Sequence, residues 1–402
     1  MKRGFVLPMV LIFVLLVVLG YWVYKNNFEK STPLTEITET QVPLSDFQDS
    51  EKQISEPVLK KENEDIPLVG VIAEGLDTPW GITFLPGGGI LVTERKGTMR
   101  LVDSTGNLKS DPVAAISSVR EIGEGGLQGI AVHPNFKSNN YMYIYYTYSG
   151  GDQGTLNRVL RFIYEGEKFT DEKIIVDAIP GASNHDGGRI RFGPDGYLYV
   201  TTGDAQNPSS AQSKDSLSGK ILRVKDDGTS APGNPFASAQ GEPSGNLVFS
   251  YGHRNPQGIA WDKNGTLWAT EHGPSGIETG NDEFNKIEMG NNYGWPDIRG
   301  TQSKEGMVTP IIESGRGNTW APAGLAYVND RFFFAGLRGT ALYELDANGK
   351  NLKTHFKGEY GRLREVIAGP DGLLYVTTSN RDGRGVPKSG DDKILRINPE
   401  KL

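Results

Sequence analysis

Most of the chain is a series of short runs in which apolar and polar residues alternate, separated by glycine-containing turns. One such run begins at Pro79, continues through an apolar–Gly–apolar stretch to Phe84, turns at 86–89 and resumes as Ile90–Glu94. Alternation with a period of two predicts half-buried β-strands, and Pro-Asp-Gly or Asn-Gly turns supply the positive φ that tight hairpins need. The pattern therefore predicts strands joined by short turns rather than long helices.

The hairpin unit recurs at intervals of about 50–60 residues, which is a spacing typical of repeat architectures. Its occurrences begin at Pro79, Leu127, Gly188, Pro256, Pro322 and Arg364. A single unit cannot bury both faces and must stack on its neighbours, and closing the stack into a ring removes the exposed ends. We therefore predict an all-β, six-bladed β-propeller over residues 66–402. The alternative, an all-β sandwich, leaves the repeat unexplained.

The N-terminal segment has a different pattern, which predicts a membrane anchor over residues 1–25. Lys2 and Arg3 precede an apolar run from Phe5 to Tyr24 that is long enough to cross a hydrocarbon core of roughly 30 Å. No small-residue cleavage site follows it, so we expect a single-pass cell-membrane protein with an extracytoplasmic domain. A secreted protein released by signal cleavage is the alternative. Residues 26–65 are polar and aperiodic, which predicts a disordered linker.

Composition excludes several classes of function. The net charge is -7 and there is no long basic run, so we expect no nucleic-acid partner. The chain has no cysteine, which excludes disulfides, thiolate metal sites and a cysteine nucleophile. The 52 glycines and 23 prolines agree with many turns.

The polar motifs lie where the repeats begin or where their second strands end. In a propeller these positions face one end of the central channel, so residues far apart in the sequence are expected to meet there. His185 is flanked by small residues that let a ligand approach, and Asp204 could orient its ring and stabilise the imidazolium after proton uptake. We interpret His133 and His355 as structural.

Basic residues and a glycine-rich loop predict an anionic ligand and a cation at the same end. Guanidinium groups pair well with planar carboxylates, so four arginines around one channel favour a polyanionic ligand, although a single arginine is usually only a solvated charge. They are Arg254, Arg338, Arg362 and Arg364. The segments 271–274, 281–283 and 290–296 combine carboxylates with Gly/Pro-rich backbone, which suits Ca²⁺; a solvated acidic turn is the alternative.

The segment from about Gly70 to Pro399 resembles the family of soluble pyrroloquinoline quinone (PQQ)-dependent glucose dehydrogenases and aldose sugar dehydrogenases. Four motifs carry the resemblance. They are Tyr251-Gly252-His253-Arg254-Asn255-Pro256-Gln257-Gly258, Glu271-His272-Gly273-Pro274, Asn292-Tyr293-Gly294-Trp295-Pro296 and Gly361-Arg362-Leu363-Arg364-Glu365-Val366-Ile367. The resemblance implies oxidation of an aldose to a lactone, with hydride passing from the anomeric carbon to PQQ.

The resemblance also implies roles for residues around the substrate. His185 matches the family's catalytic base, which takes the proton of the anomeric hydroxyl, and Asp204 matches its supporting carboxylate. Arg254 matches the arginine beside the quinone oxygens, where it stabilises developing charge. Asn255 and Gln257 match polar residues on the cofactor side.

Two calcium sites are implied in the same way. Gly273 and Pro274 match the residues whose carbonyls hold the Ca²⁺ that binds PQQ. Glu283, with the backbone of Tyr293, matches a second, structural Ca²⁺ site.

Arg362 and Arg364 match the pair that neutralises the PQQ carboxylates, but two other cofactor positions depart from the best-known members. Glu124 stands where they have a glutamine, and Arg338 where they have a lysine. Arginine keeps the charge of lysine. A glutamate beside an anionic cofactor is unexpected unless the metal or a nearby arginine pairs with it.

Other functions remain open at this point. Six-bladed propellers also host metal-dependent lactone and ester hydrolysis, which would need several carboxylates around a Ca²⁺ ion, and a propeller can bind sugar or protein without catalysis. The electron acceptor is unknown; a membrane tether would place the enzyme near respiratory-chain acceptors. The segments 205–215 and 380–392 are expected to shape the substrate pocket.

Overall fold

The computed structural model describes residues 66–236, 247–276 and 279–402. Among these residues no helix is long and apolar enough to cross a lipid bilayer. The anchor expected at 1–25 and the linker expected at 26–65 lie outside the described residues, so both stay predictions. Residues from Asp65 to Leu402 form one compact unit.

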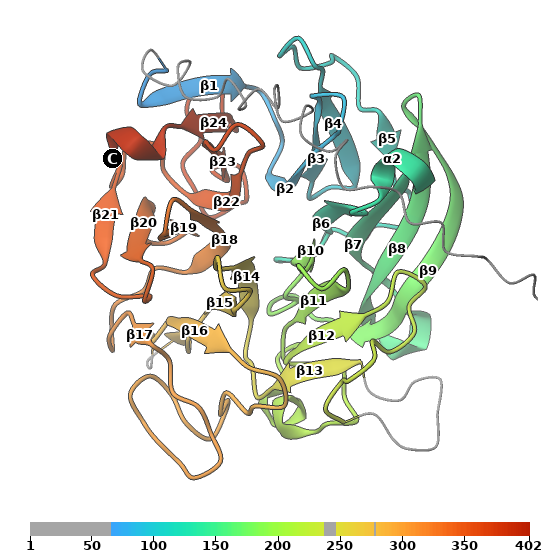
Figure 1. The fold of residues 1–402 in the computed structure, drawn as a ribbon. Helices are drawn as coiled ribbons and strands as arrows, with labels where there is room; N and C mark the ends of the chain where they lie inside the picture. The colour runs from blue at the N-terminus through green and yellow to red at the C-terminus, as the bar shows by residue number, and fades with distance from the viewer. Residues whose placement is uncertain (1–65, 237–246, 277–278) are drawn as a thin grey trace, which may run out of the picture. The chain divides into compact units, whose positions relative to one another are not determined.

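The described residues form six four-stranded antiparallel sheets arranged as blades around a centre (Figure 1). Blade 1 consists of β2 (Pro79–Phe84), β3 (Ile90–Glu94), β4 (Thr98–Val102) and β5 (Ala114–Ala115). Blade 2 consists of β6 (Leu127–Val132), β7 (Tyr141–Ser149), β8 (Thr155–Glu165) and β9 (Lys168–Pro180). Blade 3 consists of β10 (Ile190–Phe192), β11 (Leu198–Thr202), β12 (Lys220–Val224) and β13 (Val248–Tyr251).

Blade 4 consists of β14 (Pro256–Trp261), β15 (Leu267–Glu271), β16 (Glu283–Ile287) and β17 (Ile312–Glu313). Blade 5 consists of β18 (Pro322–Val328), β19 (Arg331–Gly336), β20 (Ala341–Asp346) and β21 (Lys353–His355). Blade 6 consists of β22 (Leu363–Ala368), β23 (Leu374–Thr378), β24 (Ile394–Ile397) and β1 (Val69–Ala73). The helical elements are short: α2 (Phe136–Asn139), η1 (Gly151–Gln153), η2 (Pro208–Gln212) and η4 (Pro399–Lys401). The predicted six-bladed propeller is confirmed.

The ring closes by joining the two ends of the described chain. β1 pairs antiparallel with β24, with Val69 opposite Ile397 and Val71 opposite Leu395. Figure 1 shows β1 in blue beside β24 in red. One sheet therefore contains strands from both ends.

The recurring apolar–Gly–apolar stretch is explained by the close packing of innermost strands. A Cβ added to Gly258 in β14 would overlap the carbonyl oxygen of Ala323 in β18. Thr270 in β15 donates a hydrogen bond of 2.7 Å to that same carbonyl. Glycine therefore lets neighbouring blades approach until threonine hydroxyls can satisfy the backbone at the blade starts.

Five of the six innermost strands have an irregular register at their first residues. The shift lies between Pro79 and Gly81 in β2, and between Pro256 and Gly258 in β14. Corresponding shifts occur at the starts of β6, β18 and β22. Such bulges re-aim side chains and are common beside active sites. Here they lie at the end of the ring that carries the polar motifs.

Candidate active site

A cavity of about 480 Å³ opens at this end of the ring. Its volume lies within the range of roughly 300–1,000 Å³ that is typical of small-molecule sites. The cavity is lined by seven of the residues that the sequence predicted: Glu124, His185, Arg254, Gly273, Pro274, Arg338 and Arg362. They come from loops of blades 2 to 6, so the fold brings distant segments together as expected.

His185 and Asp204 form a hydrogen-bonded pair. His185 lies between β9 and β10, Asp204 follows β11, and His185 Nδ1 is 2.7 Å from Asp204 Oδ1. Asp204 is fully buried and also accepts hydrogen bonds from the Gln206 N–H (2.9 Å) and from Trp295 Nε1 (2.8 Å). These donors fix the carboxylate, and the carboxylate in turn orients the His185 ring.

Arg254 contacts the other side of the His185 ring from Asp204. Its Nη2 lies 2.9 Å from His185 Nε2 and 3.0 Å from Ser275 Oγ, and its Nη1 donates to the carbonyl of His272 (3.3 Å). The guanidinium carbon stands 5.4 Å from the centre of the Trp295 ring. The side chain is almost fully buried, so its charge acts in a region of reduced screening.

The backbone that carries His185 is held in an unusual conformation. His185 has a φ of 65°, a left-handed value that costs most non-glycine residues energy. Its carbonyl accepts from the Ala205 N–H at 3.1 Å, and a Cβ on Gly203 would overlap that carbonyl. Glycine at position 203 therefore lets the backbone after β11 approach the His185 carbonyl closely, which a residue with a Cβ would prevent.

Glu124, which departs from the family pattern, has an arginine partner. Arg384 Nη1 donates to Glu124 Oε1 at 2.7 Å, and the His185 N–H donates to Oε2 at 3.2 Å. Burial acts to raise the pKa of the Glu124 carboxyl, but His272 and Arg384 outweigh it and hold the pKa well below its usual range. Glu124 is therefore a charged acceptor within the site, paired as the sequence argument required.

The four predicted arginines occupy different depths. Arg338 is exposed at the mouth, whereas Arg362 lines the cavity and donates twice to Asp382 Oδ2, at 2.9 and 2.7 Å. Arg364 is buried behind the lining, 3.8 Å from the same Asp382 oxygen. The structure thus adds an acidic partner, Asp382, that balances two of the arginines.

Asn255 and Gln257 lie beneath the cavity rather than on its surface. Asn255 Oδ1 accepts from the Gly187 N–H at 3.0 Å, and Gln257 Oε1 accepts from Arg364 at 3.4 Å. Both are buried. Their expected contact with a cofactor stays a prediction, while their visible contacts support the loop before β10 and Arg364.

The loop that carries Gly273 and Pro274 is anchored from below. Asp282 Oδ1 accepts from the Gly273 N–H at 2.8 Å, and a Cβ on Gly273 would overlap the carbonyls of Gly280 and Asn281. Beside it, His272 Nε2 is buried with no partner within the described residues. A tight backbone cradle next to an unpartnered polar atom agrees with a site built for a ligand.

Glu283 and Tyr293 meet at a second, much smaller cavity. Its volume is about 10 Å³, and Glu271, Glu283, Tyr293 and Trp295 are among the residues that line it. Burial and the nearby Glu271 carboxylate raise the pKa of Glu283 to about 8. A cation would relieve the repulsion between these two neighbouring carboxylates. No group of three or more His, Asp or Glu side chains suited to a metal is found in the described part of the chain.

Sequence reasoning assigned no role to three residues of the site. Trp295 supports Asp204, Asp282 anchors the Gly273 loop, and Arg384 pairs with Glu124. Trp295 and Asp282 stood within motifs noted for the site, and Arg384 within a segment expected to shape the pocket. Only the fold shows what each side chain contacts.

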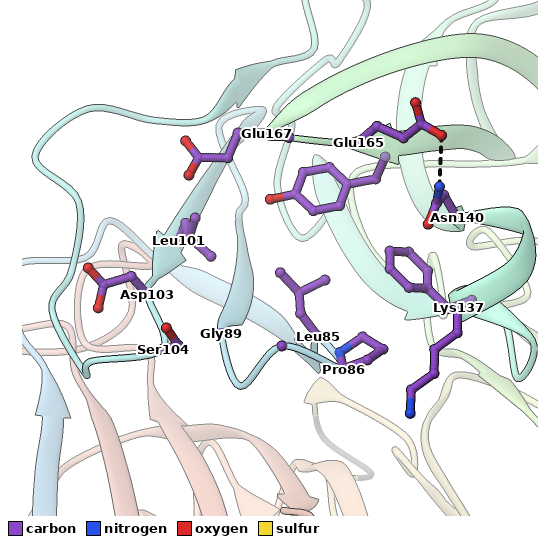
Figure 2. Close-up of a pocket in the computed structure, with 14 residues that line it drawn as sticks. Leu85, Pro86, Gly89, Leu101, Asp103, Ser104, Lys137, Asn140, Glu165 and Glu167 are labelled. Atoms are coloured by element: carbon purple, nitrogen blue, oxygen red, sulfur yellow. Dashed lines mark hydrogen bonds between the residues drawn. The ribbon is translucent and has the colours of Figure 1, made fainter.

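A larger cavity of about 570 Å³ lies elsewhere, between the turns of blades 1 and 2 (Figure 2). Leu85, Pro86, Leu101 and Tyr164 are among the residues that line it. These turns follow innermost strands rather than precede them, so this cavity is at the other end of the blades from His185. Its lining contains no histidine or arginine. We therefore assign the active site to the cavity of about 480 Å³ that contains His185.

The fold and the site together define a β-propeller with a histidine–carboxylate pair set among arginines in one cavity. Residues 76–395 match the model of the Glucose / Sorbosone dehydrogenase family, and the chain belongs to this family. It is accordingly an oxidoreductase that acts on the CH–OH group of sugars.

Individual proteins show the same relationship. The chain is 32% identical to aldose sugar dehydrogenase YliI from Escherichia coli over 82% of this chain and 92% of that protein. It is 34% identical to quinoprotein glucose dehydrogenase B from Acinetobacter calcoaceticus, over 59% and 54% of the two chains. The structure of the PQQ-bound aldose sugar dehydrogenase from Streptomyces coelicolor superposes with a TM-score of 0.73 and 40% identity, covering 82% of this chain and 97% of that one.

Proposed function

We propose that this protein oxidises aldose sugars to lactones with PQQ as the hydride acceptor and His185 as the general base. The observation that carries the proposal is the bonding of the His185 ring. Nδ1 faces the buried Asp204 carboxylate at 2.7 Å, and Nε2 faces Arg254, which has only protons to donate. Nε2 is therefore a proton acceptor at the cavity.

The residues of the cavity suit an anionic cofactor. Arg254, Arg338 and Arg362 line it, and His272 Nε2 is a buried polar atom without a partner in the described residues. We infer that Arg338 and Arg362 bind PQQ carboxylates and that Arg364, buried behind the lining, adds positive charge to the site. Asn255 and Gln257 would hold the floor of the cofactor site. When bound, PQQ supplies a quinone that accepts hydride.

The donor set beside the cofactor suits Ca²⁺. The carbonyl groups of Gly273 and Pro274 are hard oxygen ligands on a loop fixed by Asp282. We infer that these carbonyls hold a Ca²⁺ ion that helps bind and polarise PQQ, and that Glu283 with the Tyr293 backbone holds a second, structural ion.

Residues of the chain itself would accept the proton that the sugar releases and would stabilise the negative charge that develops on the hydride acceptor. His185 Nε2 would take the proton of the anomeric hydroxyl as hydride leaves the anomeric carbon, and Asp204 would stabilise the resulting imidazolium. Arg254 would stabilise negative charge that develops on the acceptor beside it. We further propose that residues 1–25 tether the enzyme to the cell membrane with its domain outside the cytoplasm, near respiratory-chain electron acceptors.

The test is reconstitution of the purified protein with PQQ and Ca²⁺, followed by a dye-linked assay across a panel of aldoses. Sugar-dependent dye reduction and a change in the PQQ absorption spectrum are expected. H185A should bind PQQ but fail to reduce it with sugar. Reconstituted wild type that shows neither turnover nor a spectral change with any aldose would overturn the proposal. Hydrolysis of lactones or esters under the same conditions would favour the hydrolase alternative instead.

A further inference from the structure

Arg384 joins two separate parts of the active-site wall. It belongs to the loop between β23 and β24 of blade 6, yet it reaches Glu124 before blade 2 and Asn184 before blade 3. Its Nη1 donates to Glu124 Oε1 at 2.7 Å, and its Nη2 donates to Asn184 Oδ1 at 3.0 Å. One guanidinium therefore contacts the residue next to the proposed base.

Glu124 contacts the same segment a second time. Its Oε2 accepts from the His185 N–H at 3.2 Å, and its own N–H donates to the Ser183 carbonyl at 2.9 Å. Together with Arg384, it places hydrogen bonds on three consecutive residues, 183 to 185. On the far side of this segment, the Ala205 N–H holds the His185 carbonyl.

The hydrogen bonds from Arg384 and Glu124 act beside a residue whose backbone conformation requires support from its surroundings. His185 has a φ of 65°, and such conformations persist only where surrounding contacts over-determine them. A small displacement of a catalytic group costs rate, because an error of 1 Å in placement can lower it by about 100-fold. Contacts that fix the His185 backbone therefore bear directly on the position of Nε2.

We propose that Arg384 and Glu124 form a positioning pair for His185, specific to chains that carry a glutamate at this position. Its kinetic consequences rest on the function proposed above. The two residues are interdependent: Glu124 is 14% exposed at its side chain and loses its cation if Arg384 is removed alone. Glutamine at 124 would keep an acceptor oxygen for the His185 N–H and would not need that cation.

The test is a double-mutant cycle of R384M, E124Q and E124Q/R384M in the reconstituted enzyme. R381M is the matched control, because Arg381 is an exposed arginine of the same loop whose Nε bonds the Asp391 carbonyl rather than the 183–185 segment. Arg384 is about half exposed and Asp382 anchors its backbone N–H at 2.9 Å, so we expect R384M to fold.

The expected result is a loss of about tenfold or more in kcat for R384M, a small effect for E124Q, and recovery in the double variant to within about threefold of E124Q. R381M should match wild type. The proposal is overturned if R384M matches R381M, or if the double variant is as impaired as R384M. R384K should be intermediate, because an ammonium cannot reproduce the forked contact to both acceptors.

A second readout needs neither PQQ nor sugar. The ¹⁵N resonances of the His185 ring, assigned by comparison with H185A, should change in R384M and return toward wild type in the double variant. If the wild type oxidises no aldose, the proposed function fails while these spectra still decide whether the two residues position the ring. Unchanged His185 resonances in folded R384M would contradict the positioning role.

Discussion

The Nη2 atom of Arg254 lies 2.9 Å from the Nε2 atom of His185. A guanidinium has no acceptor, so this contact requires a lone pair on Nε2 and places the ring proton on Nδ1, which faces Asp204. The arrangement selects the tautomer that a general base needs. In the proposed function, a sugar hydroxyl that approaches Nε2 would share that atom with Arg254.

The first prediction concerns the carboxylate that fixes this tautomer. D204N should lower kcat by roughly 10²–10⁴, because an amide can present a donor to Nδ1 and cannot stabilise an imidazolium. The check is steady-state kinetics of the reconstituted variant with a saturating dye. D195N, which alters a carboxylate paired with Arg223 in the same blade, is the control. A loss of less than threefold in D204N would show that Asp204 has no such role.

The second prediction concerns stability and pH. Burial raises the pKa of Asp186 to about 7, and its Oδ2 has no partner among the described residues. An acid whose pKa is higher in the folded state contributes stability that is present below about pH 4 and is lost as the pH rises through 7. D186N keeps an acceptor for the Ala182 N–H and the Asn157 amide but carries no charge.

D186N should therefore match wild type near pH 4 and exceed it near pH 8, by as much as a few kcal/mol, since one pKa unit corresponds to about 1.4 kcal/mol. Urea unfolding across this range measures the difference between the two proteins. Parallel pH profiles for wild type and D186N would refute the assignment.

The third prediction concerns the proposed second calcium site. Chelation should lower the melting temperature of wild type, and added Ca²⁺ should restore it, because an ion that binds only the folded state stabilises it by mass action. E283Q should be less sensitive to both treatments, since it removes one of the two carboxylates at that cavity. E288Q alters an exposed glutamate nearby and serves as the control. Equal responses in E283Q and wild type would place the structural ion elsewhere.

The fourth prediction concerns the packing of innermost strands. G258A should destabilise the protein by about 1–3 kcal/mol or more, because the added methyl would overlap the Ala323 carbonyl and Thr270 Oγ1. G70A, in strand β1, adds a methyl with nothing within 4 Å and should change stability by less than about 0.5 kcal/mol. Chemical denaturation of both variants is the measurement. Similar stabilities for the two would mean that the blades adjust to the extra methyl without cost.

The fold was predictable from the sequence because the same hairpin pattern of apolar, glycine and turn residues recurs six times. The six predicted unit starts fall at or within two residues of the starts of the innermost strands; Pro79, Leu127, Pro256 and Pro322 are the first residues of theirs. The convergence of His185, Asp204 and Arg254 followed from that topology. The resemblance, rather than periodicity, supplied their roles.

The partners of these residues were not predictable from the sequence. Arg384 and Glu124 are far apart in the chain and lie in loops, where no periodic pattern restrains the backbone. Asp382 likewise pairs with Arg362 through the conformation of the loop between β23 and β24. Charge balance within the site therefore depends on loop conformations that hydrophobic patterning does not encode.

The pairing of β1 with β24 has a consequence for the order of events during synthesis. Blade 6 combines β1, the first strand of the described domain, with β24, its last strand, so this sheet cannot be completed until β24 has been synthesised. Until then, the edge of β23 and the apolar face of β1 lack their neighbour. Closure of the ring is thus a late, long-range step, and contacts of this kind form slowly. The Arg384–Glu124 hydrogen bond joins loops of blades 6 and 2, so this part of the cavity wall forms only when the ring is closed.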